Sequence, residues 1–339
     1  MKRLAVRVLA LAALTGLLLA ASEGLLRCAA RGVLPQVGCW RDDAFRLEPG
    51  CVQRVRGGER GSWTLRADAD GFRRGEGRGP WLLAGDSQVF AQGVEEGEMA
   101  AAVATRAGVG VRAVGLPGFG VVEALAAAAA SLGGVRGLVL AVDPANDWRD
   151  ALLPMERRYL RVGGWLLQSS WEGSWSARVL ASPLGRSQVV VQGLRLLAAR
   201  RAADPHALRL FESPWGLSPE ERGRAEAGMT GAIQAFAAAH PGLDLRVLLL
   251  PLDFATGEAR AREVLADEGL ALRPWEDRAL WTGLRAGLAP LPVLDASALP
   301  WQPRDFQAGD FHLSIAGQAR LGAFLAAELA GRAPAEGVE

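Results

Sequence analysis

The feature that most constrains this chain is the apolar run of residues 81–88, Trp-Leu-Leu-Ala-Gly-Asp-Ser-Gln. A run of this length that stops at a glycine is typical of a buried strand, and the glycine lets the chain turn sharply. Open α/β sheets bind their ligands at this end of the strands. Ser87 therefore lies where a nucleophile would be placed, although Gly-Asp-Ser is also common in ordinary turns.

A second group of polar residues lies near the other end of the chain. Asp310 and His312 precede residues 316–329, which have a helical pattern that Ser314 is expected to cap. An early serine and a late acid–histidine pair are the parts of a Ser-His-Asp relay. Asp310 is the predicted acid in preference to Asp305, which lies farther from the histidine; the alternative is that Asp310 is a surface acid.

The remaining apolar runs alternate with helical patterns. Further strands are expected over residues 109–114, 138–142, 244–250 and 291–295, and helices over residues 98–107, 122–132, 189–201, 218–240 and 259–288. Strands that alternate with helices at this spacing favour a parallel sheet with helices on both faces. The predicted fold class is therefore α/β.

Four short motifs, in order, resemble the sequence blocks of the SGNH (GDSL-type) hydrolase superfamily, in particular its membrane-attached bacterial members. They are Gly-Asp-Ser at residues 85–87, Leu-Pro-Gly-Phe-Gly at 116–120, Asp-Pro-Ala-Asn-Asp at 143–147 and Asp-Phe-His at 310–312. Residues 68–73 resemble an element that precedes the first block, and Arg73 in it is expected to be structural. The resemblance covers residues 64–330 and implies a flavodoxin-like three-layer α/β/α sandwich with a mostly parallel five-stranded sheet.

The resemblance also implies a role for each site residue. Ser87 would be the nucleophile, His312 its general base and Asp310 the acid that orients the imidazole. The oxyanion hole would consist of the backbone N–H groups of Ser87 and Gly118 and the side chain of Asn146. Without the resemblance, Gly118 is a glycine that a turn requires and Asn146 is a loop cap.

Two blocks depart from the family pattern. Pro144 stands where a glycine is usual, and it stiffens the approach to Asn146. The acid lies two residues before the histidine, where the family usually has three. A two-residue spacing resembles the SGNH-like proteins that acetylate exported polysaccharides.

The implied activity is that of an exported carboxylic-ester hydrolase that removes acyl groups, with acetyl as one candidate, from a glycan or lipid. One alternative is an O-acyltransferase of exported polysaccharide that uses the same serine. The other is an inactive SGNH-like scaffold that binds a glycan or a membrane partner. No cofactor and no metal are predicted, because the three histidines are scattered and unpaired with cysteine. The net charge of +1 gives no reason to expect nucleic acid as a partner.

The amino terminus has the pattern of a signal-anchor or of a cleaved signal peptide over residues 1–27. A basic front precedes an apolar stretch up to residue 21 that only Arg7 interrupts. An anchor would hold the domain at the cell membrane, on its periplasmic or extracellular side. Cleavage near Ala20-Ala21-Ser22 would instead give a secreted protein. In an oxidising compartment Cys39 and Cys51 could form a disulfide, with Cys28 left over; the alternative is three free thiols.

The predicted domain organisation follows from these segments. Residues 28–63 lack clear periodicity and are interpreted as a juxtamembrane segment, and residues 64–332 as one domain, followed by a tail over 333–339. Residues 150–201 are interpreted as an insertion with a hairpin around Gly163-Gly164. The tryptophans that follow, Trp171 and Trp175, are expected either to face a substrate or to fill a small core or face the membrane.

Overall fold

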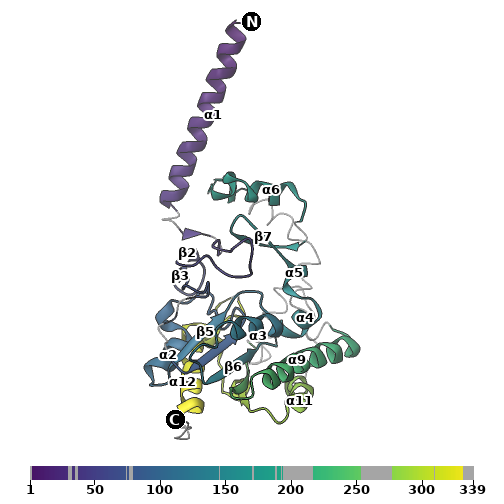
Figure 1. Cartoon of the computed structure of the whole chain (residues 1–339). Helices are drawn as coiled ribbons and strands as arrows, with labels where there is room; N and C mark the ends of the chain where they lie inside the picture. Colours follow the sequence, from purple (N-terminus) through teal and green to yellow (C-terminus); the bar gives the residue numbers. More distant parts are fainter. Residues whose placement is uncertain are drawn as a thin grey trace.

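The centre of the fold is a five-stranded parallel sheet (Figure 1). The computed structural model describes residues 2–29, 33–34, 37–73, 75, 79–144, 146–169, 172–187, 189–191, 193, 217–252, 277–308 and 310–330. The strands lie in the order β10-β9-β6-β4-β5, and all neighbouring strands are parallel. In chain order they are β4 (Trp81–Gly85), β5 (Val111–Gly115), β6 (Gly137–Val142), β9 (Asp244–Leu249) and β10 (Val293–Asp295). The predicted fold class is confirmed.

The strands form here because they are apolar on both faces. Every residue of β4 and of β6 is buried, as expected of parallel strands that are covered on both sides. Side chains of successive residues point to opposite faces of the sheet. Leu82 therefore packs in one core and Leu83 in the other, so that the sheet separates two hydrophobic cores.

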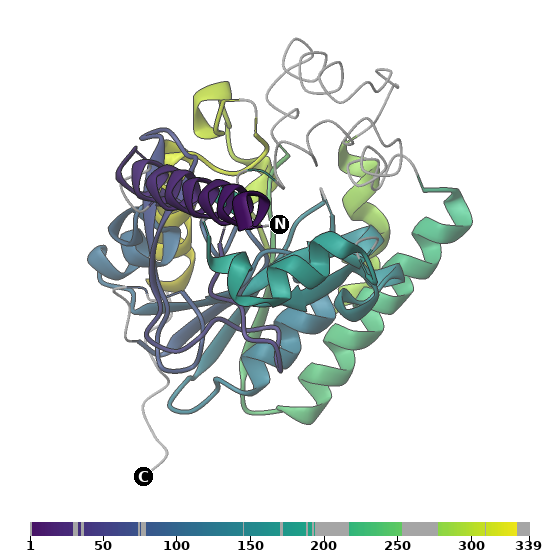
Figure 2. The ribbon, with the colours of Figure 1, turned by 90° about the horizontal axis from the view of Figure 1, so that it is seen from above.

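Helices cover both faces, which gives three layers (Figures 1 and 2). On one face α2 (Ala100–Arg106) packs against α12 (Ile315–Ala330), and both contribute to the same core. On the other face α3 (Val121–Ala129), α9 (Pro219–Ala239) and α11 (Asp277–Leu288) pack together. The predicted α/β/α sandwich is therefore confirmed.

Two helix starts follow local rules that the sequence contains. The Ser218 hydroxyl accepts from the Glu221 N–H and the Glu221 side chain accepts in return, so that α9 begins with a capping box. The Ser314 hydroxyl accepts from the Gly317 N–H at 3.0 Å at the start of α12, as predicted. Most of the predicted helix over 189–201, and residues 259–276 of the other, lie outside the described residues.

Residues 28–63 are more than a lead-in to the domain, which corrects the sequence-based interpretation. They include β1 (Val33–Leu34), β2 (Val52–Arg56) and the start of β3 (Ser62–Arg66), which form a separate three-stranded sheet. The side chains of Val55 and Trp63, which are paired across β2 and β3, are buried in the same core as α3 and α9. The sequence signal is weak because β1, β2 and β3 are short and β2 does not alternate regularly between polar and apolar residues.

A disulfide joins Cys39 to Cys51, with their Cα atoms 6.3 Å apart. Of the two alternatives for the cysteines, this is the one the structure adopts. The bridge ties the segment before residue 40 to the start of β2. It therefore fixes the small amino-terminal sheet against the chain that precedes it.

The amino terminus forms one helix, α1 (Lys2–Ala29), which extends away from the sandwich (Figure 1). Its described leucines are largely exposed; Leu14 and Leu18, for example, are 53% and 58% exposed. The carboxylate of Glu23 accepts from the Ser187 hydroxyl at 2.8 Å and from the Val189 N–H at 3.0 Å. Among the helices in the described ranges, none is both long and apolar enough to cross a lipid bilayer.

The insertion contains the predicted hairpin. Its strands β7 (Tyr159–Val162) and β8 (Trp165–Gln168) are antiparallel and turn at Gly163-Gly164. Short helices stand before and after it, namely α4 (Asp147–Leu152), α5 (Met155–Arg158) and α6 (Trp175–Ala181). Trp175 is 54% exposed, whereas Trp171 lies outside the described residues.

Candidate active site

The turn that carries Ser87 begins where β4 ends. At Gly85 a Cβ atom would lie 2.6 Å from a methyl carbon of Val89, so only glycine allows the turn to fold back onto the strand. The Asp86 carboxylate accepts from the Gln88 N–H at 2.9 Å and closes the turn. Ser87 is 8% exposed at the carboxyl end of β4, next to β6. In a sheet of this order β5 is added on one side of β4 and β6 on the other, and ligands bind where the strand order reverses in this way.

A buried arginine holds the loop that follows the turn. Arg73 Nη1 donates to the carbonyls of Phe90 and Ala91 at 2.7 and 2.5 Å, and Nη2 donates to the carbonyl of Val94. The guanidinium also lies 4.5 Å from the centre of the Trp63 ring. Burial lowers the pKa of Arg73 to about 10, so that it remains charged near neutral pH. Arg73 therefore has the structural role that the sequence suggested.

The acid–histidine pair forms a direct contact. His312 Nδ1 lies 2.6 Å from Asp310 Oδ1, which also accepts from the His312 N–H at 3.1 Å. Burial acts to raise the pKa of Asp310, but the hydrogen bond and charge of His312 outweigh it, and the pKa is lowered overall. Asp310 is therefore ionised at neutral pH, and His312 Nδ1 carries the proton between them. His312 Nε2 is buried and has no hydrogen-bond partner among the described residues.

The side chain of Gln88 joins this loop to the turn of Ser87. Gln88 Nε2 donates to the carbonyl of Phe311 at 3.1 Å, and Gln88 Oε1 accepts from the Leu313 N–H at 3.0 Å. Phe311 and Leu313 flank His312, so the residue directly after Ser87 holds the backbone on both sides of the histidine. Gln88 is 4% exposed, which makes both hydrogen bonds inaccessible to water. The structure thus brings the segments that carry Ser87 and His312 together, although no hydrogen bond joins His312 Nε2 to Ser87.

Two further buried glutamines support the same arrangement. The Gln307 N–H donates to the carbonyl of His312 at 2.9 Å, and Gln307 Nε2 donates to the carbonyl of Gln92 at 2.6 Å. Gln318, on α12, donates to the carbonyl of Gln88 at 3.0 Å. The loop that follows Ser87 and the loop of His312 are therefore joined at several points.

Gly118 lies in the loop after β5 and has a backbone that only glycine adopts readily. Its φ is +84°, and a Cβ atom would lie 2.9 Å from the Tyr159 ring. Arg158 Nη2 donates to the Gly118 carbonyl at 2.8 Å, and Arg158 Nη1 lies 3.0 Å from the carboxylate of Asp150. The insertion therefore supplies the groups that hold this loop in place.

Asn146 lies between two acids at the end of β6. Its side-chain N–H donates to Asp150 Oδ2 at 2.9 Å, and a hydrogen bond from Asn146 is also among the interactions that lower the pKa of Asp86. Asn146 Oδ1 is buried without a partner among the described residues. The amide thus lies beside the turn of Ser87, but carboxylates engage it.

Buried acids surround Asn146. Burial raises the pKa of Asp86, against the hydrogen bonds and the charge of His312 that lower it. Burial raises the pKa of Asp150 to about 7, although Arg158 and Asn146 act to lower it. Burial also raises the pKa of Asp147, and the charges of its acidic neighbours raise it further. Within the described ranges, no three acids, histidines or cysteines are grouped so that they could hold a metal ion.

The sequence did not indicate the residues that hold the predicted site residues in place. Asp305, the alternative acid, is paired with Arg320 at 3.1 Å and does not contact the histidine. No sequence motif pointed to Gln88, Asp150 or Arg158. For Asp150 a signal existed, since it lies four residues after Asn146 on a helix, where side chains meet.

Comparisons with known proteins give only distant likenesses. No family model and no curated protein matches the sequence. A lipase/acylhydrolase from Enterococcus faecalis is 14% identical, with a TM-score of 0.36, over 77% of this chain and 100% of the other. A protein assigned to the lipolytic G-D-S-L family from Desulfitobacterium hafniense DCB-2 is 11% identical, with a TM-score of 0.37, over 73% and 97%.

A third solved structure is a carbohydrate esterase family 2 enzyme with its carbohydrate-binding domain, from Corynascus thermopiles (Myceliophthora fergusii). It is 14% identical, with a TM-score of 0.33, over 81% of this chain and 74% of the other. These structural neighbours are SGNH/GDSL-type acylhydrolases and an esterase. At such TM-scores the likeness carries no argument about function, which therefore depends on the chain's own residues and geometry.

Replacing Gln88 tests whether it positions His312. Gln88→Leu is expected to lower the free energy of unfolding by about 2 kcal/mol, because two buried hydrogen bonds are lost. It should also broaden the NMR resonance of the His312 Nδ1 proton, which is easily assigned in a chain with three histidines. Gln318→Leu is the matched control: it removes buried hydrogen bonds without touching the residues that flank His312. An equally sharp resonance in both variants would contradict the role of Gln88.

The raised pKa of Asp147, one of the buried acids near Asn146, predicts that the stability of the protein depends on pH. Because the pKa of Asp147 is raised in the folded protein, the folded state binds more protons than the unfolded state as pH rises above about 4. Stability is therefore expected to fall as pH rises, by at most about 1.4 kcal/mol per pH unit for this group. The side chain of the Asp147→Asn variant is neutral at every pH. The free energy of unfolding of this variant should therefore rise relative to that of the wild type as the pH is raised from about 4 to about 8. Parallel profiles of unfolding free energy for the two proteins would count against this assignment.

Proposed function

We propose that this protein is a serine esterase of the SGNH/GDSL type that removes acyl groups from a glycan or lipid. The observation that supports it most is the pair of hydrogen bonds that the Gln88 side chain forms with the residues on either side of His312, donating to Phe311 and accepting from Leu313. They connect the residue after Ser87 to a histidine whose Nδ1 is held by Asp310. A hydroxyl, an imidazole and an orienting carboxylate at one strand end are the groups that ester cleavage by a serine requires.

In the proposed reaction His312 Nε2 takes the proton of the Ser87 hydroxyl as Oγ attacks the ester carbonyl. The bond of Nδ1 to Asp310 selects the tautomer in which Nε2 carries the lone pair, and the ionised Asp310 stabilises the imidazolium. His312 then gives the proton to the departing alkoxide, which leaves an acyl group on Ser87. Water, activated by the same imidazole, hydrolyses the acyl-enzyme and restores the serine.

The negative charge on the tetrahedral intermediate would be stabilised by the N–H groups of Ser87 and Gly118 and by the Asn146 amide. Asn146 donates to Asp150 in the resting site, and this bond orients the amide. The raised pKa values of Asp86 and Asp150 favour the use of Asn146 by the substrate. A neutral carboxyl group competes for an N–H less strongly than a carboxylate does.

The test uses p-nitrophenyl acetate and a fluorophosphonate probe. We expect Ser87→Ala and His312→Ala to abolish hydrolysis, and Ser87→Ala to abolish labelling. Asn146→Ala should lower kcat by roughly 10²–10³ and leave the labelled serine in place, because only one oxyanion donor is lost. Folded wild-type protein that neither hydrolyses esters nor reacts with the probe would instead support the inactive binding scaffold.

Hydrolysis and acyl transfer use the same acyl-enzyme and differ in the acceptor. The Asp-x-His spacing is the feature that motivates the transferase alternative. An isotope-labelled acetyl donor, supplied with candidate glycans, distinguishes the two activities. Release of labelled acetate supports the esterase, and label on the glycan supports the transferase.

We further propose that α1 attaches the chain to the cell membrane and that the α/β domain lies on the periplasmic or extracellular side of that membrane. The exposed leucines of α1 support an apolar environment for that helix, and the Cys39–Cys51 bridge supports an oxidising compartment.

Fractionation of cells that express the full chain tests this location. We expect the wild type in washed membranes, with Cys39 and Cys51 unreactive to thiol reagents until reduced. A Leu14→Glu/Leu18→Glu variant should move to the soluble fraction, because two charges oppose contact with lipid. Soluble wild type, or free thiols at these two positions, would show that the assigned location is wrong.

A further inference from the structure

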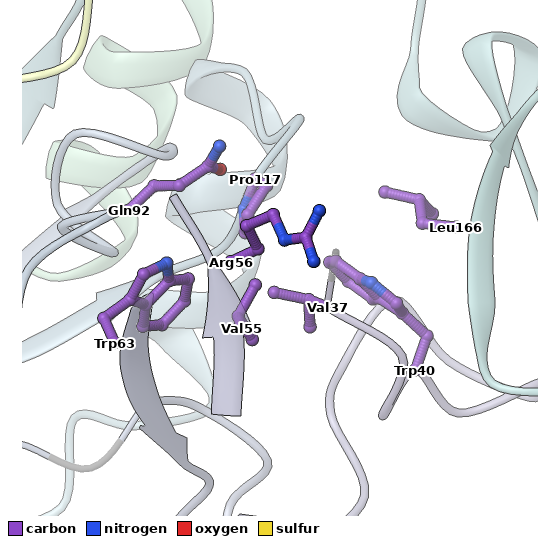
Figure 3. Close-up of a pocket in the computed structure, with 8 residues that line it drawn as sticks. All are labelled: Val37, Trp40, Val55, Arg56, Trp63, Gln92, Pro117 and Leu166. Atoms are coloured by element: carbon purple, nitrogen blue, oxygen red, sulfur yellow. The ribbon is translucent and has the colours of Figure 1, made fainter. Parts of the chain in front are cut away.

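A pocket of about 220 Å³ lies between the small amino-terminal sheet and the loops of the site (Figure 3). Its lining residues come from four segments far apart in the chain. They are Val37, Trp40, Val55, Arg56, Trp63, Gln92, Pro117 and Leu166.

The position of the pocket relates it to the proposed chemistry. Gln92 belongs to the loop that Ser87 begins, and its N–H donates to the Ser87 carbonyl at 3.2 Å. Pro117 directly precedes Gly118, a proposed oxyanion donor. Leu166 comes from the hairpin of the insertion, on the strand β8. The pocket therefore borders the loops that carry Ser87 and Gly118.

The walls of the pocket are held rigidly. The Cys39–Cys51 bridge joins the segment of Val37 and Trp40 to the strand that carries Arg56. The Trp40 N–H donates to the carbonyl of Gly164 in the hairpin at 3.0 Å. A pocket whose walls are fixed before binding loses little entropy when a ligand enters.

The groups that a ligand can reach in the pocket are one cation, the Arg56 guanidinium, and small apolar side chains. Trp40 and Trp63 are each only 2% exposed, so they form the floor and offer no open face for stacking. Arg56 is exposed, and Figure 3 shows its side chain reaching from the end of β2 into the space between the two tryptophans. In the part of the chain that the structure describes, the Arg56 guanidinium has no ion pair and no hydrogen bond.

We propose that this pocket binds an anionic group, a carboxylate or a phosphate, on the alcohol part of the ester substrate. This inference rests on the proposed esterase function and narrows its substrate class. A guanidinium matches the planar geometry of a carboxylate or the oxygens of a phosphate, with which it forms paired hydrogen bonds. The Gln92 side chain also lines the pocket, where its amide can bond to a hydroxyl of the same ligand.

The same charge argues against a long acyl chain as the occupant. An aliphatic chain would cover the exposed Arg56 guanidinium without offering it a hydrogen-bond partner, and removing a charge from water in this way is costly. A pocket of this size also accommodates one small group rather than an extended lipid tail. The structure therefore favours an acylated anionic glycan over a neutral lipid.

The experiment compares three acetylated sugars: a methyl galacturonoside, glucose 6-phosphate and a neutral methyl glucoside. We expect the wild type to prefer one or both anionic esters over the neutral ester by about ten- to a hundredfold in kcat/KM. Arg56→Ala should remove this preference through KM and leave the neutral ester and p-nitrophenyl acetate unchanged. The control is Arg54→Ala, which removes the same charge from the same strand, because Arg54 is bonded to Ser62 and does not line the pocket.

The two anionic esters distinguish the sources of the charge, since preference for one identifies a carboxylate and preference for the other a phosphate. Equal use of all three sugars by an active wild type, or an equal effect of Arg54→Ala, overturns the pocket assignment and leaves the esterase intact. Binding of methyl galacturonoside and glucose 6-phosphate to Ser87→Ala protein, measured by calorimetry, tests the pocket without catalysis. Loss of that binding on adding Arg56→Ala supports the site even if no esterase activity is found, and no binding of either sugar overturns it.

Discussion

The site depends on one buried amide. Gln88 donates to the residue before His312 and accepts from the residue after it, at 3.1 and 3.0 Å. A serine and a histidine that are so distant in sequence can act together only if their separation is fixed within a fraction of an ångström. The residue directly after Ser87 links the two segments, because its side chain is bonded to the backbone on both sides of the histidine. The hydrogen bonds of Gln307 and Gln318 extend the same connection to the loop after Ser87 and to α12.

The acids beneath the site serve a different purpose. Asp86, Asp147 and Asp150 are almost fully buried, and burial raises the pKa of each. A cluster of this kind is tolerated only if some of its members hold a proton, because like charges at close range cannot all ionise. When Asp150 is protonated, it still accepts a hydrogen bond from Asn146 but competes for that N–H less strongly than a carboxylate does. The pKa of Asp310, by contrast, is lowered by its contact with His312, so that acids with raised and with lowered pKa values lie near one another.

How much the sequence could predict depended on whether the signal was local. The five strands, the cap at Ser218 and the turn at Gly163-Gly164 follow from short patterns, and they appear within a few residues of the expected bounds. The resemblance supplied Ser87, Gly118, Asn146, Asp310 and His312, and the structure places these five near the same strand ends, although their catalytic roles stay a proposal. Gln88 and Arg158 could not be found, because their value comes from contacts with residues remote in the chain. Residues 28–63 were misinterpreted for the same reason.

That misinterpretation concealed the most informative part of the molecule. Seen as a lead-in to the domain, the segment has no bearing on the site. In the structure the disulfide, β2 and β3 bring Arg56 and the buried Trp63 against the loops of Ser87 and Gly118. The α/β sandwich carries the proposed reacting groups, and the pocket beside them takes one wall from the amino-terminal segment and another from the insertion. Arg73 contacts both the Trp63 ring and the loop after Ser87, so that the proposed binding pocket and the proposed reacting groups are held by the same side chain.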